Sequence, residues 1–320
     1  MMYVSMVYAF IYVFIVTALG TLFVDALFRF LGKRGFLGNL FPNVRGGIPR
    51  GVGIIPFIVL SFYLLPGYND LVLIIGICAF IDDVFGRRKF SFMNIEIGQF
   101  SRGIGMILVM ILGFIHGFGL SSIIIAFLIQ PLNISDMQPG SCAMVTMVMS
   151  IVTIICMVIA GSHPVAELPA TYTPLLIFVV CLAYCPLDFA GKIMLGEVGN
   201  HTFAVALGIA FYLTGGFWWT LLLAIFTVLF TAFVRRSTLK VFFRQRLRLL
   251  NPTFGDYIMD VLTGGGLGDL FRKWILKDKQ YEVNNEILIS LGFRRLLFNP
   301  HAVHTDGFVQ KEPQSLGGVR

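Results

Sequence analysis

The chain has 320 residues, of which 57% are hydrophobic and 13% are charged, and its mean hydropathy is +0.84. A soluble domain of this length cannot bury that much apolar surface, so the composition excludes an ordinary soluble protein and indicates several membrane-spanning helices. The net charge of +7 comes from basic residues that flank apolar segments, as in loops beside anionic lipid, and we therefore expect no nucleic acid among the partners.

Nine apolar segments follow one another along the first 234 residues. They cover approximately residues 3–30, 51–65, 70–81, 103–115, 119–131, 142–160, 174–186, 202–214 and 217–234. A straight span requires roughly 20 apolar residues, so the short segments 70–81 and 119–131 are the weakest of the nine. We expect an all-α, polytopic transmembrane bundle of about nine or ten spans.

The basic residues indicate how such a bundle is oriented. If nine spans alternate, one side carries all of the Lys and Arg residues between them, namely Lys33, Arg34, Arg45, Arg50, Arg87, Arg88, Lys89, Arg102 and Lys192. Because Lys and Arg collect in cytoplasmic loops, this places the N-terminus outside and the C-terminus inside. The polar stretches at Asp82, 131–141 and 187–201 then all emerge on the cytoplasmic face, where we expect an active site.

The character of the chain changes after residue 234. Six basic residues alternate with apolar ones up to Arg248, which predicts an amphipathic segment lying on the inner leaflet. The glycine run at 264–266 lacks the Lys-Ser or Lys-Thr of a phosphate-binding loop and predicts a flexible turn before a small cytoplasmic tail. We therefore expect a transmembrane catalytic domain over residues 1–234 and a basic segment with a tail over 235–320.

Two adjacent carboxylates, Asp82 and Asp83, close one of the apolar runs and are followed by Gly86. An ionisable group inside a bilayer is costly, so such residues lie at a boundary or serve a function. One interpretation is a solvated loop chosen for solubility. The other is a site for a divalent cation or for phosphoryl transfer, because hard cations prefer oxygen ligands.

Three further polar stretches have both a structural and a chemical interpretation. The stretch 45–53 combines glycines with Arg50, which suits either an ordinary positive loop or a phosphate contact. Asn133 and Asp136 either cap a helix or share one face of it. The stretch with Glu197 between Gly196 and Gly199 is either an ordinary interhelical loop or a site where the carboxylate has room beside it for a metal and a diphosphate.

Together and in this order, the four stretches resemble the polyprenyl-phosphate N-acetylhexosamine-1-phosphate transferases. This family includes the phospho-N-acetylmuramoyl-pentapeptide transferase and the bacterial and archaeal GlcNAc-1-phosphate transferases. The matching stretches resemble its Pro-Arg-Gly-Gly-Gly, Asp-Asp-x-x-Gly, Asn-x-x-Asp and Met-Leu-Gly-Asp-x-Gly-Ser motifs, and are Pro49–Gly53, Asp82–Gly86, Asn133–Asp136 and Met194–Asn200. The resemblance covers roughly residues 33–200.

The chain departs from the family pattern at three places. Glu197 stands where the family usually has a metal-binding Asp, which keeps the charge and lengthens the side chain by one methylene. Pro139-Gly140 replaces the more common Asp-Gly after the Asn-x-x-Asp loop. The histidine-rich sugar-recognition loop has no counterpart, since His301 and His304 lie in the polar tail and do not match it.

The resemblance implies transfer of a sugar-1-phosphate from a UDP-sugar to a polyprenyl phosphate in cell-envelope glycan synthesis, with Mg2+ or Mn2+ as the cofactor. It assigns Asp82 to the attacking lipid phosphate and Asp83 with Glu197 to the metal. Substrate contacts fall on the remaining polar residues, which are Arg50, Asn133, Asp136, Lys192 and Asn200. It also implies a location in the plasma (inner) membrane and a homodimer as a candidate assembly.

Two alternatives stay open. Glu197 and the missing histidine loop suggest a membrane paralogue that binds lipid phosphate or nucleotide without turnover. A transporter is less favoured, because the acidic residues gather at one face and none lies at the middle of the membrane. Asp25, the acidic residue of the first span, is expected to pair with Arg29 one helical turn away.

Overall fold

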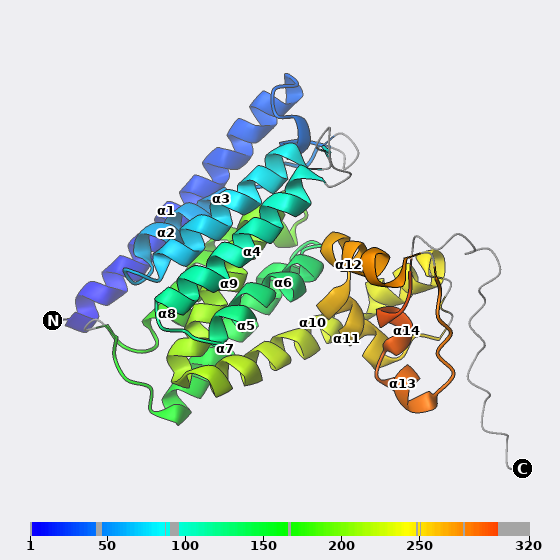
Figure 1. The fold of residues 1–320 in the computed structure, drawn as a ribbon. Helices are drawn as coiled ribbons and strands as arrows, with labels where there is room; N and C mark the ends of the chain where they lie inside the picture. The colour runs from blue at the N-terminus through cyan, green and yellow to red at the C-terminus, as the bar shows by residue number, and fades with distance from the viewer. Residues whose placement is uncertain are drawn as a thin grey trace, which may run out of the picture. The chain divides into compact units, whose positions relative to one another are not determined.

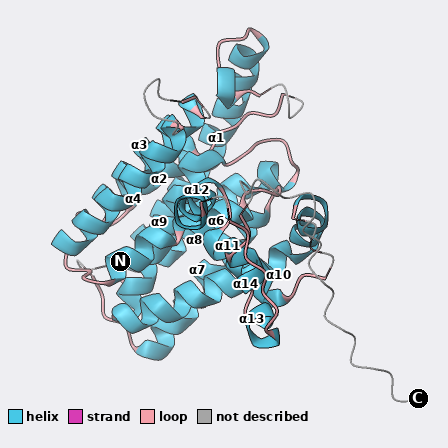
Figure 2. Cartoon of the chain, turned by 45° about the vertical axis from the view of Figure 1, so that its right-hand side comes forward, coloured by secondary structure: helices cyan, strands magenta, loops and turns pink. Residues whose placement is uncertain are grey.

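The computed structural model describes residues 2–42, 47–86, 88–89, 96–165, 168–247, 249, 251–277 and 279–299. Within these residues all regular secondary structure is helical (Figures 1 and 2). The only β-type pairings among them are two isolated bridges. The predicted all-α class is therefore confirmed. The chain forms two compact units, Met1–Thr227 and Val228–Arg320. The expected division at residue 234 stays a prediction.

Each predicted apolar segment is helical in the structure. The helices up to residue 246 are α1 (Met2–Lys33), η1 (Gly38–Leu40), α2 (Ile54–Tyr63), α3 (Asn69–Phe85), α4 (Ile97–Ile115), α5 (Ser121–Phe127), α6 (Ile129–Ser135), α7 (Ser141–Ala160), α8 (Tyr172–Phe189), α9 (Gly196–Gly215) and α10 (Phe217–Arg246). The segment expected over 119–131 consists of two short helices, α5 and α6, which meet at Leu128.

Five of the described helices are long and apolar enough to cross a membrane. They are Met6–Lys33, Ile97–Ile115, Ser141–Ala160, Tyr172–Phe189 and Phe217–Gln245. The helices over Ile54–Tyr63 and Ser121–Ser135 are apolar but shorter than a span. The chain is therefore a helical membrane protein. The ion pair expected within the first span is confirmed, since Arg29 Nε lies 2.8 Å from Asp25 Oδ1.

Helix α9 is the core of the first unit. Its residues from Val198 to Phe211 are all buried, and it packs against α2, α3, α5, α6, α7 and α8. A helix that is apolar on all sides must be covered on all sides, which explains this central position. Neighbouring contacts run from α1 to α2, from α2 to α3 and from α3 to α4, and these helices lie side by side in Figure 1.

The second unit corrects the expectation of a small tail after the glycine run. Residues 254–299 contain four further helices, namely α11 (Phe254–Thr263), α12 (Gly266–Leu276), α13 (Glu286–Ser290) and α14 (Phe293–Leu296). Buried ion pairs hold them together: Arg294 Nη2 lies 2.6 Å from Asp256 Oδ2, and Arg295 Nε lies 2.5 Å from Asp260 Oδ1. The glycine run is a turn, as predicted, but it joins two packed helices. His301 and His304 lie outside the described residues.

The basic stretch after residue 234 also differs from its expectation. Helix α10 continues without interruption from Phe217 to Arg246, so the stretch extends an apolar helix and does not begin a new element. Where this helix lies relative to lipid stays a prediction.

Candidate functional site

The four polar stretches meet at one end of the first unit. They lie immediately before α2, at the C-terminal end of α3, at the C-terminal end of α6 and at the start of α9. Side chains from all four contact one another through the ion pairs and hydrogen bonds described below. The convergence that alternating helices predicted is therefore present, and the antiparallel path of successive helices is what produces it. Which side of the membrane this end faces stays a prediction.

The stretches before α2 and α9 are bound directly to each other by their backbones. Val52 N–H donates to the carbonyl of Met194 at 3.2 Å, and Gly53 N–H donates to that of Leu195 at 3.1 Å. A Cβ at residue 53 would lie 2.4 Å from the Leu195 carbonyl oxygen and 2.6 Å from Gly199 Cα. These glycines therefore allow two chain segments to touch. At these glycines the partner segment occupies the space that one of the two interpretations assigned to a ligand.

Asp83 lies beneath this junction with its side chain fully buried. It accepts hydrogen bonds from the backbone N–H groups of Glu197 (3.0 Å) and Val198 (2.9 Å), in the first turn of α9. Arg50 Nε lies 3.1 Å from its Oδ1. The first N–H groups of a helix have no partner within it and form a positive end, so a carboxylate satisfies them. Asp83 thus anchors α9 to α3.

Asp82 points elsewhere, because successive residues of a helix project about 100° apart. Its Oδ2 accepts a hydrogen bond from Arg102 Nη2 of α4 at 2.8 Å. Gly98 on the same helix lets α4 approach, since a Cβ there would lie 1.9 Å from Asp82 Oδ1. The two adjacent carboxylates are therefore separated by the structure: one binds α4 and the other binds α9.

Glu197 is the hub of the network. Its Oε2 lies 2.8 Å from Arg102 Nη2 and 3.4 Å from His201 Nε2, while Oε1 lies 3.4 Å from Arg50 Nη2. With its amide nitrogen facing Glu197, Asn133 donates to Oε2 at 3.1 Å and accepts from Arg102 Nη1 at 2.7 Å. Three carboxylates, those of Asp82, Asp83 and Glu197, thus share two arginines within this network.

Asp136 is next to this network, in the turn after α6. Its Oδ2 lies 3.4 Å from Asn200 Nδ2 of α9. Burial raises the pKa of the Asp136 carboxyl well above its usual value, and the nearby negative charge of Asp188 raises it further. Asp188 itself is 2% exposed, and its Oδ2 has no hydrogen-bond partner among the described residues.

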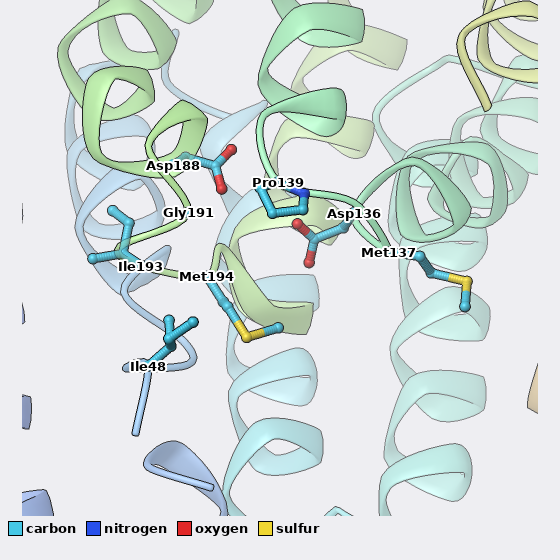
Figure 3. Close-up of a pocket in the computed structure, with 8 residues that line it drawn as sticks. All are labelled: Ile48, Asp136, Met137, Pro139, Asp188, Gly191, Ile193 and Met194. Carbon is cyan, nitrogen blue, oxygen red and sulfur yellow. The ribbon is translucent and has the colours of Figure 1, made fainter. Parts of the chain in front are cut away.

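Asp136 and Asp188 line a cavity of about 120 Å³, and both carboxylates are directed toward it from different helices in Figure 3. The other lining residues are mostly apolar and are Ile48, Met137, Pro139, Gly191, Ile193 and Met194. At about 30 Å³ per water, this space holds a few waters or a small part of a ligand. Its two acidic groups favour a ligand portion that donates hydrogen bonds.

The structure thus brings together most of the residues selected from the sequence: Arg50, Asp82, Asp83, Asn133, Asp136, Glu197 and Asn200. Lys192 is the exception. Its side chain is exposed, and its described contacts are made by its backbone, which accepts a hydrogen bond from Arg29 and donates one to Leu187.

Sequence analysis missed three members of this end of the bundle. Arg102 served there only to indicate orientation, although a single charge inside an apolar helix is itself a signal of function. His201 follows Glu197 by four residues and so shares its helix face. Asp188 begins the polar stretch that contains Glu197, but the sequence assigned it no role, because its contact with the turn after α6 depends on how α8 packs.

No protein-family model matches this chain, and a search of curated proteins gives no match. The function of the site therefore rests on its own residues and on the resemblance of the four stretches to the transferase motifs.

Asp83 and Glu197 are the residues expected to hold Mg2+, which requires oxygen ligands in near-octahedral geometry. Asp83 already accepts two backbone hydrogen bonds and pairs with Arg50, and both oxygens of Glu197 face positive or donor groups. In this arrangement Asp83 and Glu197 do not fit a metal site. Binding of Mg2+ or Mn2+ stays a prediction.

Proposed function

We propose that this chain transfers a sugar-1-phosphate of the N-acetylhexosamine type from a UDP-sugar to a polyprenyl phosphate. A phosphate oxygen of the lipid would attack the β-phosphorus of the nucleotide sugar. A new oxygen–phosphorus bond forms, the bond from the β-phosphorus to the bridging oxygen breaks, and UMP leaves. One observation carries the proposal: the four stretches that resemble the family's motifs share one network of ion pairs and hydrogen bonds.

The network offers groups suited to each part of this reaction. Arg50 is its most exposed arginine, with 29% of its side chain accessible, and its planar guanidinium suits a diphosphate. Arg102 is nearly buried and holds Asp82 and Glu197 in place. Positioned positive charge stabilises the charge that develops on the transferred phosphoryl group. We assign Asp82 to the lipid phosphate and the cavity beside Asp136 to the nucleotide.

The test is to incubate the purified protein in lipid nanodiscs with UDP-GlcNAc, a short polyprenyl phosphate and Mg2+, and to measure UMP. We expect UMP only when both substrates are present, and repeating the assay with EDTA in place of Mg2+ tests separately whether a divalent cation is required. The exposed Lys240 supplies a control, since Lys240→Gln should leave the rate unchanged. Absence of UMP with UDP-GlcNAc, UDP-GalNAc and other UDP-sugars from a folded protein would reject the proposal.

A second function, binding of nucleotide or lipid phosphate without turnover, is favoured by a separate observation. The carboxylates expected to hold the metal are instead engaged by arginines and backbone N–H groups. Calorimetry distinguishes the two: heat of UDP-sugar binding without UMP release would support the non-catalytic function.

Shortening Glu197 tests whether its reach matters for turnover. Glu197→Asp keeps the charge but withdraws the carboxylate by one methylene, so it cannot keep contact with Arg50, Arg102 and His201 together. We expect UMP release to fall about 10- to 100-fold, as for other losses of orienting contacts. Unchanged or higher activity would show that the shorter Asp of the family motif serves equally well here.

A further inference from the structure

Helix α12 of the second unit exposes large apolar side chains and buries a charged one. Phe271, Trp274 and Ile275 are 61%, 75% and 54% exposed, although they are large and apolar. Arg272 and Leu276, one turn apart on the other side, are only 5% and 8% exposed. An amphipathic helix of a soluble domain turns its apolar stripe inward, so this helix has the opposite sense.

The buried side of α12 explains why the aromatic side cannot also face inward. Arg272 forms a short ion pair with Asp269 and donates to Thr263 Oγ1 at 3.0 Å. Arg295 Nη2 lies 3.8 Å from the same aspartate. Asp269 lies on α12 itself, so rotating the helix would keep its pair with Arg272. The rotation would break the hydrogen bond from Arg272 to Thr263 and separate Asp269 from Arg295, and it would leave buried charges with fewer partners. The apolar face therefore stays outside.

The outer face has the composition of a membrane interface. Aromatic side chains are enriched at the level of the lipid headgroups, and Lys side chains extend from such helices toward anionic phosphate. Lys273 and Lys277 are exposed beside Phe271, Trp274 and Ile275. Such a cluster is unusual on a surface that faces only water, because soluble proteins keep contiguous apolar patches small.

We propose that the face formed by Phe271, Trp274 and Ile275 inserts into the headgroup region of the bilayer that holds the rest of the chain. The sequence makes such an insertion feasible, since a candidate span ends at Gln245 and α12 begins at Gly266. Lys273 and Lys277 are four residues apart and so flank the apolar face along the same edge, where their charge matches that of anionic lipid. This surface is independent of the proposed transferase activity.

The fluorescence of Trp274 provides the test, with the full chain reconstituted in nanodiscs. Subtracting the emission of Trp274→Phe from that of the wild type isolates the signal of Trp274 while leaving Trp218 and Trp219 unchanged. An inserted helix lies about 5 to 10 Å deep. We therefore expect blue-shifted emission that lipids brominated near the headgroup quench more strongly than lipids brominated near the chain end.

A pair of variants separates this face from apolar exposure in general. Phe271→Ser with Ile275→Ser should abolish the quenching of Trp274 and shift its emission to the red. Ile287→Ser with Leu291→Ser, which are also exposed in this unit, should change neither signal. Lys273→Gln with Lys277→Gln should remove the extra quenching seen with anionic lipid.

Two results would overturn the proposal. Red emission that no brominated lipid quenches would show that the face is in water. Blue emission without quenching, together with cross-linking of Trp274→Cys between chains, would show that a second copy covers the face and that lipid does not.

Discussion

At the scale of single residues, the site consists of buried charges that depend on one another. Arg102 lies between Asp82 and Glu197 and is 9% exposed. Burying a charge costs several kcal/mol unless a partner of opposite charge offsets the cost. Removing one member therefore leaves the others buried without compensation and lowers the free energy of unfolding. Such a cluster gives the end of the bundle one defined arrangement.

Replacing Arg102 by Met should therefore destabilise the protein more than loss of an ordinary contact would. We expect a loss of about 3 to 5 kcal/mol, because Asp82 and Glu197 would remain buried without this partner. Thermal unfolding in detergent measures the change, with the exposed Lys240→Gln as the control. A shift no larger than that of the control would show that water replaces the arginine.

Asp136 supports a prediction about pH. Its pKa in the folded protein is raised by burial and by Asp188, whereas in the unfolded chain it is ordinary, about 3.9. Stability from this group is therefore present below pH 4 and is lost as the pH rises toward the raised pKa. We expect Asp136→Asn to increase the unfolding temperature at pH 8 and to have a smaller effect at pH 5. An equal effect at both values would contradict the raised pKa.

At the scale of elements, the junction of the stretches before α2 and α9 determines how closely these helices approach. Gly53 and Gly199 are in contact through their backbones, and three main-chain hydrogen bonds join Pro49–Gly53 to Met194 and Leu195. Asp83 ties the same point to α3. A side chain added at this junction would push the two segments apart and shift Glu197 away from Arg50 and Arg102.

Gly53→Ala should accordingly destabilise the protein, by about 1 to 3 kcal/mol or more, because no rigid backbone atom can move aside. Gly103 in α4 is the matched control, since a Cβ there meets nothing within 4 Å. Replacing it by Ala should stabilise the helix by about 0.5 to 1 kcal/mol. Opposite shifts in unfolding temperature are the expected result, and equal shifts would contradict the role of the junction.

At the scale of the whole molecule, orientation in the membrane follows from the distribution of Lys and Arg. If the basic loops are cytoplasmic, the end of the bundle with the arginine and carboxylate network faces a soluble nucleotide sugar and a lipid phosphate at once. Five of the described helices are long enough to span a membrane. Whether the shorter apolar helices also cross it has to be determined by experiment.

Cysteine labelling provides that experiment. His163, Lys89 and Lys192 are exposed in turns between helices, and each can be replaced by Cys. We expect an impermeant maleimide to label residue 163 in intact cells and residues 89 and 192 only after permeabilisation. The parent chain, whose five cysteines are reduced, is the control. Labelling of residues 163 and 192 from the same side would contradict nine alternating spans.

The sequence by itself determined the helical class, the position of nearly every helix before residue 246 and the identity of most residues at the site. Hydrophobic runs and isolated charges are local signals, and a charge in an apolar chain is conspicuous. The pairing of Asp25 with Arg29 followed from helical spacing alone. The folded second unit could not be predicted in this way, because its interior includes ion pairs between distant residues such as Arg294 and Asp256.

Only the tertiary structure decided what each polar residue binds. Asp82 and Asp83 are neighbours in the chain, yet helical geometry sends one to Arg102 and the other to the start of α9. The glycines expected to make room for a ligand instead let two segments touch. Glu197 and Arg50 are 147 residues apart and meet through packing. Such partners depend on which helices are adjacent, and no local pattern of residues contains that information.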